Sequence, residues 1–362
     1  MKTVAVVSGF ERFKGSTVVA AGYFDALQQL GYEPHWYQCV TGNHREAYGP
    51  PGQSVRGVST GVRSFDQGLN FSFFFPRRLG RLPEELVLLT DPALLGAVNA
   101  NPGSWVVVHD LREFSAEGRT GLAGPALFFY LLSKIRRARG VLIDSESTRA
   151  DLARRFPELP RTTVVHPGVR TRADGSHHLE RSLERRKSGA PLRFVYVAVD
   201  RPYKQIRFVI DLARALDAQR MDSSIQITLV SRLRPSTQRY LDRAPPRSLR
   251  VLPEVEEIDP EYEAADGLLF PSTFEGFGLP VVEAMSFGLP VISGAAPAVT
   301  ELLEGAGRSI DRLDVAEWLS AMNDLRDPAT YEREARRSLA RSDYFSPASF
   351  RARLAKVLET WT

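Results

Sequence analysis

The stretch PSTFEGFGLPVVEAMSFGLPVIS, residues 271–293, decides the fold of the second half of the chain. It follows a short apolar run, residues 268–270, that is typical of a fully buried strand. Pro280 suits the first turn of a helix, because its missing N–H costs nothing there. The stretch therefore predicts a loop over residues 271–278 and then a helix over residues 279–286, whose start offers N–H groups to an anion.

Two carboxylates stand eight positions apart in this stretch. Glu275 lies in the expected loop, and Glu283 lies about one turn inside the expected helix. Gly276 and Gly278 allow the backbone to approach a ligand closely. Both carboxylates can then accept hydrogen bonds from the hydroxyls of a sugar or a ribose. The alternative is that Glu275 caps the helix and Glu283 is a solvated helix position, and the residues alone leave both interpretations open.

Apolar strand-like runs alternate with helical patterns on both sides of this stretch. This alternation predicts an α/β protein with parallel sheets that are covered on both faces. The expected strands are residues 4–7, 33–40, 86–89, 105–108, 141–143 and 163–165, then 192–199, 225–230, 268–270 and 290–292. The expected helices include residues 16–30, 125–139, 147–156, 204–218 and 279–286. Residues 172–191 are polar and charged, and they predict a linker between two Rossmann-like halves.

Length and composition restrict the class of protein. The chain has 362 residues, enough for two domains, and its 43% apolar and 25% charged residues exclude a disordered or collagen-like chain. Cys39 is the only cysteine, so neither an intrachain disulfide nor a cysteine-based metal cage can form. No apolar stretch approaches the roughly 20 residues of a membrane-spanning helix. We expect a cytoplasmic protein, attached to a membrane surface at most.

The pattern E-G-F-G-L-P-x-x-E-A-M-x-x-G-x-P-V runs from Glu275 to Val291. It resembles the E-x7-E motif of the retaining glycosyltransferases of family 4. The resemblance implies the GT-B fold, with two Rossmann-like domains, a cleft between them and a C-terminal helix that crosses back to the first domain. The expected parts are an acceptor-side domain, a linker and a nucleotide-sugar donor-binding domain: residues 1–171 with about 343–362, residues 172–191, and residues 192–342.

The resemblance also assigns roles to residues of the motif. Glu275 would lie beside the hydroxyls of the donor sugar, and Glu283 would bind the ribose of the nucleotide. The remaining expected donor-binding residues stand at the start of the helix: Gly276, Phe277, Gly278 and Leu279.

Arg201 and Lys204 follow the expected strand 192–199. They resemble the Arg and Lys pair that the family places after the first strand of its second domain, although the spacing here is only three residues. Cleavage of a sugar–phosphate bond loads negative charge onto the diphosphate, and two fixed cations stabilise that charge. The alternative is a surface Arg and Lys at a helix start.

The first half offers two further candidate sites. His109 follows the strand 105–108 and resembles the family's strand ending in His-Asp, so it is a candidate catalytic residue that binds the sugar or the acceptor. The alternative is a structural histidine. Lys14, Gly15 and Ser16 resemble the family's first glycine loop and are expected near the acceptor or a phosphate. The resemblance implies that neither a metal nor another cofactor is needed, and the sequence, which contains no D-x-D motif and no His/Cys cluster, is consistent with this expectation.

The resemblance implies a retaining enzyme, with a hexosyltransferase favoured. It would move a sugar from a nucleotide-diphosphate sugar to a hydroxyl of a glycan, a lipid-linked sugar or a small molecule. An oxygen of the leaving phosphate would accept the proton, by way of a short-lived oxocarbenium-like ion pair. Two alternatives stay open: a nucleotide-sugar hydrolase, epimerase or phosphorylase of the same fold, and a non-catalytic protein that binds nucleotide sugars or polyanions. Nucleic acid is not an expected partner, because the basic residues are scattered.

Charge is distributed unevenly along the chain. Residues 1–170 carry 20 Lys or Arg against 15 Asp or Glu, a net +5, and residues 171–362 carry 27 against 28, a net −1. Aromatic residues stand beside basic ones in residues 70–81 and 125–139, a composition that suits an anionic lipid surface. Peripheral contact with the inner membrane surface is therefore one alternative. The other is that these are core-facing segments with solvated ends.

Overall fold

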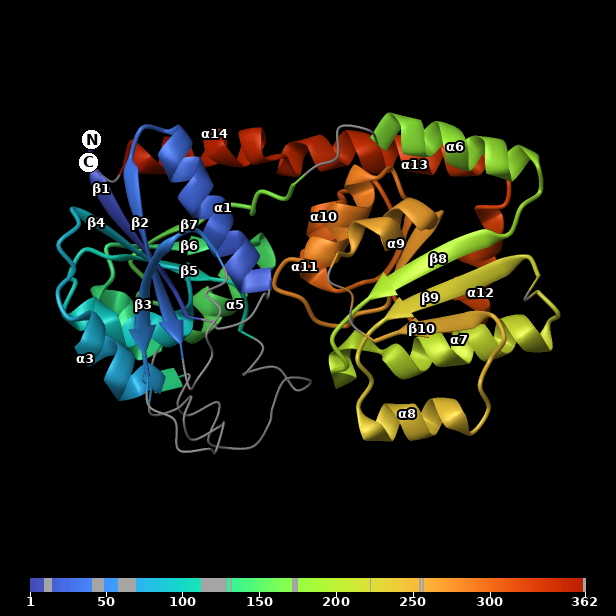
Figure 1. Cartoon of the computed structure of the whole chain (residues 1–362), viewed down its shortest axis with the longest axis horizontal. Helices are drawn as coiled ribbons and strands as arrows, with labels where there is room; N and C mark the ends of the chain where they lie inside the picture. The colour runs from blue at the N-terminus through green and yellow to red at the C-terminus, as the bar shows by residue number, and fades with distance from the viewer. Residues whose placement is uncertain are drawn as a thin grey trace. The chain divides into compact units, whose positions relative to one another are not determined.

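The computed structural model describes residues 1–9, 15–40, 49–57, 70–111, 129–130, 132–170, 175–221, 223–253, 255 and 257–360. The chain divides into two compact units, each built on a parallel sheet (Figure 1). Unit 1 comprises residues 1–169 and 347–362, and unit 2 comprises residues 170–346. Within the described ranges, no helix combines the length and the apolar character that spanning a membrane requires.

Unit 1 contains a seven-stranded parallel sheet in the order β3-β2-β1-β4-β5-β6-β7. Its strands are β1 (Thr3–Ser8), β2 (Glu33–Val40), β3 (Gly52–Arg56), β4 (Leu86–Leu89), β5 (Trp105–Val108), β6 (Gly140–Ile143) and β7 (Arg161–Val164). The central strand β1 pairs Val6 with Trp36 on one side and Leu88 on the other. Successive residues 4–7 are all fully buried, so both faces of the sheet are covered.

The described helices of unit 1 include one from the end of the chain. They are α1 (Gly15–Gln29), η1 (Asn70–Phe74), α3 (Phe75–Leu79), η2 (Pro92–Asn99), η4 (Lys134–Arg137), α5 (Glu146–Arg155) and α14 (Pro347–Leu358). Helix α14 packs on α1, where the rings of Phe350 and Tyr23 meet edge to face at 5.0 Å. A Cβ added to Gly168 would lie 2.8 Å from the Phe350 side chain, so α14 sits tightly against the segment after β7.

Unit 2 contains a six-stranded parallel sheet in the order β10-β9-β8-β11-β12-β13. Its strands are β8 (Leu192–Val197), β9 (Ile225–Val230), β10 (Leu249–Leu252), β11 (Gly267–Phe270), β12 (Val291–Gly294) and β13 (Arg308–Ile310). Its helices are α6 (Gly175–Lys187), η5 (Pro202–Lys204), α7 (Ile206–Ala218), α8 (Pro235–Asp242), α9 (Asp259–Ala264), α10 (Leu279–Ser286), α11 (Pro297–Leu303), α12 (Val315–Asp324), α13 (Pro328–Ser342) and η6 (Asp343–Phe345).

The expectation that residues 172–191 form a linker is wrong, because most of them form helix α6. Leu179 and His178 are buried on one face of this helix, and α6 packs against α13. At its end, Arg185 and Arg186 form ion pairs with the fully buried Asp266. Arg185 and Arg186, two of the basic residues that suggested a solvated linker, are therefore ion-pair partners of a buried carboxylate.

The expected strands were confirmed within a few residues, whereas β3, β10 and β13 were not predicted. Strand β3 is largely exposed and β13 has three residues, so neither gives a long apolar run. Of the expected helix 125–139, the structure forms η4 at Lys134–Arg137, and residues 125–128 and 131 lie outside the described ranges.

Candidate functional site

The loop after β8 is held in place by a buried carboxylate. Asp200 is 5% exposed, accepts a hydrogen bond from the Arg234 N–H at 2.7 Å and lies 3.3 Å from the Nε of Arg234. Pro202 then starts the short helix η5, which ends at Lys204. Gln205 adopts φ 55°, the left-handed region that side chains other than glycine rarely occupy, and α7 begins directly after it. The chain turns sharply here, immediately beside Lys204.

Lys204 and Glu275 form an ion pair. The Nζ of Lys204 donates to Oε1 of Glu275 at 2.5 Å, and the two side chains are only 13% and 11% exposed. The Lys204 ammonium also lies 5.2 Å from the centre of the Phe270 ring. The structure thus brings together a cation and a carboxylate that stand 71 positions apart, next to the carboxyl ends of β8 and β11.

Backbone contacts join the two loops that carry this pair. The N–H of Thr273 donates to the carbonyl of Tyr203 at 2.9 Å. The hydroxyl of the buried Tyr196 donates to the carbonyl of Lys204 and lies 3.5 Å from the Ser272 hydroxyl. Tyr196, which belongs to strand β8, therefore contacts both the loop that carries Lys204 and the loop that carries Glu275.

Helix α10 begins where the sequence predicts it. Gly278 precedes it with φ 110°, a conformation that strains any residue with a Cβ. Phe277 is buried, and its ring packs on that of Phe345 at 5.6 Å. Gly276 and Leu279 are partly buried on either side. The Phe277 side chain thus anchors the loop to Phe345, within unit 2. Any contact of Phe277 with a ligand would therefore come from its backbone.

Glu283 lies in the first half of α10 and is bonded to a tyrosine of α9. The Tyr262 hydroxyl donates to Oε2 of Glu283 at 2.8 Å. Burial raises the pKa of the Glu283 carboxyl above its usual range, and the Tyr262 hydrogen bond, which favours the ionised form, opposes that rise. Glu283 is therefore neither a solvated surface position nor directly paired with a cation in the described part of the chain.

Arg201 stands three residues before Lys204 and is exposed, at the start of η5. In unit 1, Gly15 and Ser16 form the start of α1, with Gly15 exposed. Lys14 lies outside the described residues.

His109 follows β5 in unit 1, and both of its ring nitrogens are engaged. Nδ1 lies 2.7 Å from Oδ2 of Asp144, and Nε2 lies 2.8 Å from the Thr90 carbonyl. Both partners accept hydrogen bonds, so the ring must donate from both nitrogens, as an imidazolium does. Burial lowers the pKa of His109, but the charges of Asp144 and Asp91 outweigh burial and raise it to about 9. His109 is therefore a fixed cation.

The residues that sequence reasoning missed are the ones that hold others in place. Tyr196, Tyr262 and Asp200 carry no spacing signal, because each acts on a partner far away in the sequence. Tyr196 offers one local signal, a hydroxyl in a largely buried strand. Across the described ranges, no three His, Cys, Asp or Glu side chains gather as a metal site would need.

Comparison with known proteins gives one match to a family model and several to curated relatives. Residues 191–327 match the model of the family Glycosyl transferases group 1. O-antigen chain mannosyltransferase B of Escherichia coli is 36% identical over 110 residues, 30% of this chain and 26% of the relative. D-inositol 3-phosphate glycosyltransferase of Salinispora arenicola is 30% identical over 214 residues, 53% of this chain and 48% of the relative. The matches thus span less than half the length of either relative.

Solved structures match the whole chain at low identity. HepE from Anabaena, in complex with UDP-glucose, has a TM-score of 0.73 at 15% identity, covering 99% of this chain and 100% of its own. Sucrose-phosphate synthase from Thermosynechococcus elongatus has a TM-score of 0.74 at 15% identity, with 99% of both chains covered. This likeness shows the GT-B fold of two Rossmann-like domains. Lys204, Glu275 and Glu283 all lie within residues 191–327, the part of the chain that matches the Glycosyl transferases group 1 model.

Proposed function

We propose that this chain is a retaining glycosyltransferase that moves a hexose from a nucleotide-diphosphate sugar to an acceptor hydroxyl. The observation that carries the proposal is the enclosed ion pair of Lys204 and Glu275, 2.5 Å apart beside the start of α10. The family match of residues 191–327 supports it. The relatives named as mannosyltransferase and inositol-phosphate glycosyltransferase, and the UDP-glucose in HepE, favour a hexose and a nucleoside diphosphate.

In this proposal the donor lies across the start of α10. The helix N-terminus attracts the diphosphate. Glu275 accepts hydrogen bonds from hydroxyls of the sugar, and Glu283, steadied by Tyr262, accepts them from the ribose. The raised pKa of Glu283 fits a carboxylate that is enclosed before the ribose arrives.

Lys204 and Arg201 stabilise the leaving diphosphate. The Lys204 ammonium uses one of its three N–H groups on Glu275, which leaves two for phosphate oxygens. Arg201 is exposed and has a planar fork that matches phosphate. Negative charge grows on the diphosphate as the sugar–phosphate bond breaks, so these cations bind the transition state more tightly than the substrate. The chain's own cations thus supply the stabilisation, and we propose that no metal or other cofactor is needed.

The route of the acceptor hydroxyl's proton in this proposal is compatible with retention of the anomeric configuration. His109 already donates from both nitrogens and has a pKa of about 9, so it does not take a proton from the acceptor near neutral pH. We assign that proton to an oxygen of the leaving phosphate, which lies on the face where the acceptor attacks. His109 contributes a fixed positive charge in unit 1.

We further propose that unit 1 takes the acceptor and contacts an anionic membrane. Phe73, Phe129 and Tyr130 are about half exposed. Basic groups lie on two of these rings, with the Arg77 guanidinium 3.5 Å from the centre of Phe73 and the Lys134 ammonium 4.3 Å from that of Tyr130. Helix η2 packs against both η1 and η4, so one short helix joins the two aromatic and basic segments.

The test is product analysis with UDP-, GDP-, ADP- and dTDP-linked sugars, preselected by the thermal stabilisation that a bound donor gives. We expect a glycosylated acceptor whose anomeric configuration, read by NMR, matches that of the donor. Lys204→Ala and Glu275→Ala should lower kcat on the order of 100- to 1000-fold, while Lys187→Ala, an exposed lysine at the end of α6, leaves it unchanged.

Other products would identify the alternatives. Free sugar without an acceptor indicates a hydrolase, an isomerised donor an epimerase, and phosphate-dependent turnover a phosphorylase. Donor binding without any turnover indicates a non-catalytic binding protein. Wild-type turnover in both the Lys204 and the Glu275 variants would refute the site.

A further inference from the structure

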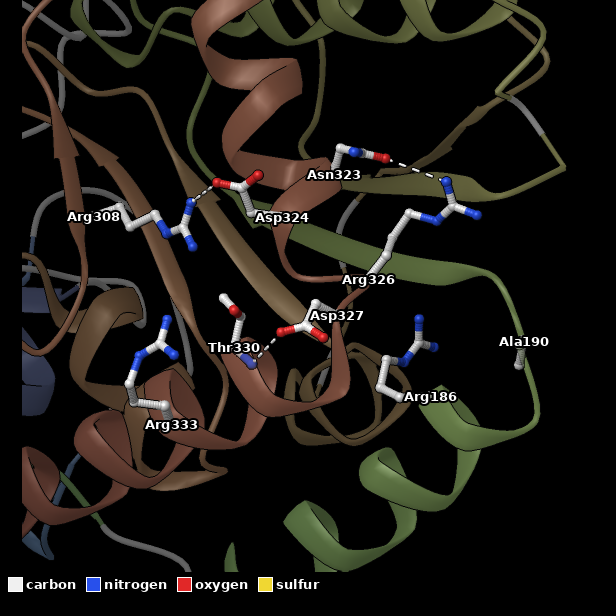
Figure 2. Close-up of a pocket in the computed structure, with 10 residues that line it drawn as sticks. Arg186, Ala190, Arg308, Asn323, Asp324, Arg326, Asp327, Thr330 and Arg333 are labelled. Atoms are coloured by element: carbon white, nitrogen blue, oxygen red, sulfur yellow. Dashed lines mark hydrogen bonds and ion pairs between the residues drawn. The ribbon is translucent and has the colours of Figure 1, made fainter.

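A cavity lies within unit 2, with a volume of about 630 Å³ (Figure 2). Its walls come from the end of α6, the residues before β8, the start of β13 and the junction of α12 with α13. Strands β8 and β13 both begin here, whereas Lys204 and Glu275 follow the ends of β8 and β11. In a parallel sheet the strand starts and the strand ends form opposite edges, so this cavity is separate from the candidate active site.

Arginine dominates the lining of this cavity. The four arginines come from α6, β13, the α12–α13 junction and α13: Arg186, Arg308, Arg326 and Arg333. Two acidic residues, Asp324 and Asp327, also line it. Four positive and two negative charges leave a formal charge of +2 on the lining. Four segments of the chain thus converge on one basic hollow.

Both acidic residues already have partners. Asp324 binds Arg308 at 2.6 Å, and Glu334 binds the same guanidinium at 2.6 Å. Asp327 accepts a hydrogen bond from the Thr330 N–H at 2.8 Å and so caps α13, which lowers its pKa. These two carboxylates therefore act mainly on Arg308 and on the start of a helix, and the charge of Arg333 makes a smaller contribution to the lowered pKa of Asp327.

Arg326 and Arg333 are exposed and weakly held. The Nη1 of Arg326 lies 3.3 Å from the Asn323 side-chain oxygen, a neutral partner. The Nη2 of Arg333 lies 4.0 Å from Oε1 of Glu334, which is already bound to Arg308. Both guanidinium groups can therefore turn toward a ligand without breaking a short ion pair.

Arg186 supplies a buried donor in the same wall. Its side chain is 2% exposed, its Nη2 donates to the Pro191 carbonyl at 2.9 Å, and its Nε has no hydrogen-bond partner among the described residues. Burial lowers the pKa of Arg186, the charge of Asp266 opposes this effect, and the charges of Arg185 and then Arg326 add to it. In Figure 2 the guanidinium group of Arg326 is turned toward Asn323, and that of Arg186 lies below it in this view. The Nη2 of Arg186 also lies 3.5 Å from the buried Asp266, so the positive charge that remains for an anion comes chiefly from Arg326 and Arg333.

We propose that this cavity binds a small phosphorylated molecule, at a site distinct from that of the sugar donor. Guanidinium groups bind phosphate oxygens through two parallel hydrogen bonds, which gives arginine clusters their preference for phosphate. The volume of about 630 Å³ lies within the usual range for small-molecule sites. The ligand would join the end of α6 to the α12–α13 junction through Arg186, Arg326 and Arg333.

Inorganic phosphate and pyrophosphate are the probes for this site. Thermal unfolding and calorimetric titration of the full chain are measured with ionic strength matched by NaCl, so that general screening is subtracted. We expect saturable stabilisation of the wild type. The double variant Arg326→Ala/Arg333→Ala, which changes two exposed side chains, should bind pyrophosphate at least about tenfold more weakly. Arg336→Ala, on the same helix but outside the cavity, should bind as the wild type does.

A third variant separates this site from the candidate active site. Lys204→Ala should keep the stabilisation by pyrophosphate if the cavity binds it. The proposal is overturned if no stabilisation exceeds that of NaCl, if the double variant is stabilised as much as the wild type, or if Lys204→Ala abolishes the effect. None of these outcomes decides whether the chain transfers sugars, because that is read from products.

Discussion

At the scale of single residues, the candidate site depends on hydrogen bonds that hold charged groups before any ligand arrives. Tyr196 fixes the backbone of Lys204, Tyr262 fixes Glu283, and Asp200 fixes the loop that leads to Arg201. Preorganisation of this kind matters because a group that is already in place costs no reordering during the reaction.

Tyr262→Phe tests one of these positioning residues. The change removes the hydroxyl that donates to Glu283 and leaves the ring in place. We expect the donor KM to rise roughly tenfold, with kcat nearly unchanged, because uniform binding is lost. Loss of this hydrogen bond should also raise the pKa of Glu283 further. As the pH is lowered, Glu283 should therefore become protonated, and donor binding should weaken, at a higher pH in the variant than in the wild type. Steady-state kinetics against pH measures both effects.

Tyr240→Phe is the matched control, since the Tyr240 hydroxyl donates to Asp211 on α7, outside the candidate site. Equal effects of the two variants would show that Tyr262 has no particular role toward the donor.

His109 predicts how stability depends on pH. Its pKa in the folded protein, about 9, exceeds the ordinary value of 6.5, so its contribution is fully present below pH 6.5 and is lost as the pH rises to about 9. We expect the wild type to lose up to about 3 kcal/mol of unfolding free energy over this window. His109→Gln should lose less, and the difference between the two is read from urea unfolding. His35 also has a raised pKa but is present in both proteins. Parallel pH profiles would contradict the imidazolium assignment.

At the scale of elements, α6 shows where sequence patterns mislead. Its end carries three basic residues in succession, Arg185 to Lys187, and charge runs of this kind usually mark solvated segments. Here Asp266, about 80 residues away and fully buried, pairs with two of them. The pattern of the segment alone cannot reveal a partner that stands directly before β11.

Leu179→Ala distinguishes a packed helix from a linker. Leu179 is 4% exposed, so removing its side-chain methyl groups should cost about 2–5 kcal/mol of stability. Glu180→Ala, the exposed neighbour, should stay within about 0.5 kcal/mol of the wild type. Chemical unfolding gives both values, and a neutral Leu179→Ala would contradict the packing of α6.

The sequence predicted most strands and the local structure around Glu275, because continuous apolar runs and the Gly-Leu-Pro helix start are signals within a few residues. It could not predict that Lys204 meets Glu275, a contact that depends on strands β8 and β11 being neighbours. Nor could it predict that both nitrogens of His109 are occupied, since Thr90 and Asp144 come from the ends of β4 and β6.

At the scale of the whole molecule, the proposed membrane contact concerns one unit only. Unit 1 has the exposed aromatic residues with basic neighbours, and residues 1–170 carry a net charge of +5. A charged unit and a nearly neutral one are suited to different partners.

Vesicle cosedimentation tests this division. The wild type should bind vesicles rich in phosphatidylglycerol, bind phosphatidylcholine vesicles weakly, and release from both as salt increases. Phe73→Ser/Phe129→Ser should weaken binding roughly tenfold or more, because two half-exposed rings are lost. Leu313→Ser, an exposed apolar residue of unit 2, serves as the control. Binding that ignores lipid charge and the two phenylalanines would contradict the proposal.

The return of α14 to unit 1 affects how the chain is made. Unit 2 is an insertion between residue 169 and residue 347, and Phe350 of α14 fills the space between Tyr23 and Gly168. During synthesis, unit 2 can fold as soon as it has left the ribosome. Unit 1, although it is translated first, must wait for the final residues before its packing is complete. A chain that ends at residue 346 and has been released from the ribosome should therefore hold a finished second unit and an unfinished first one.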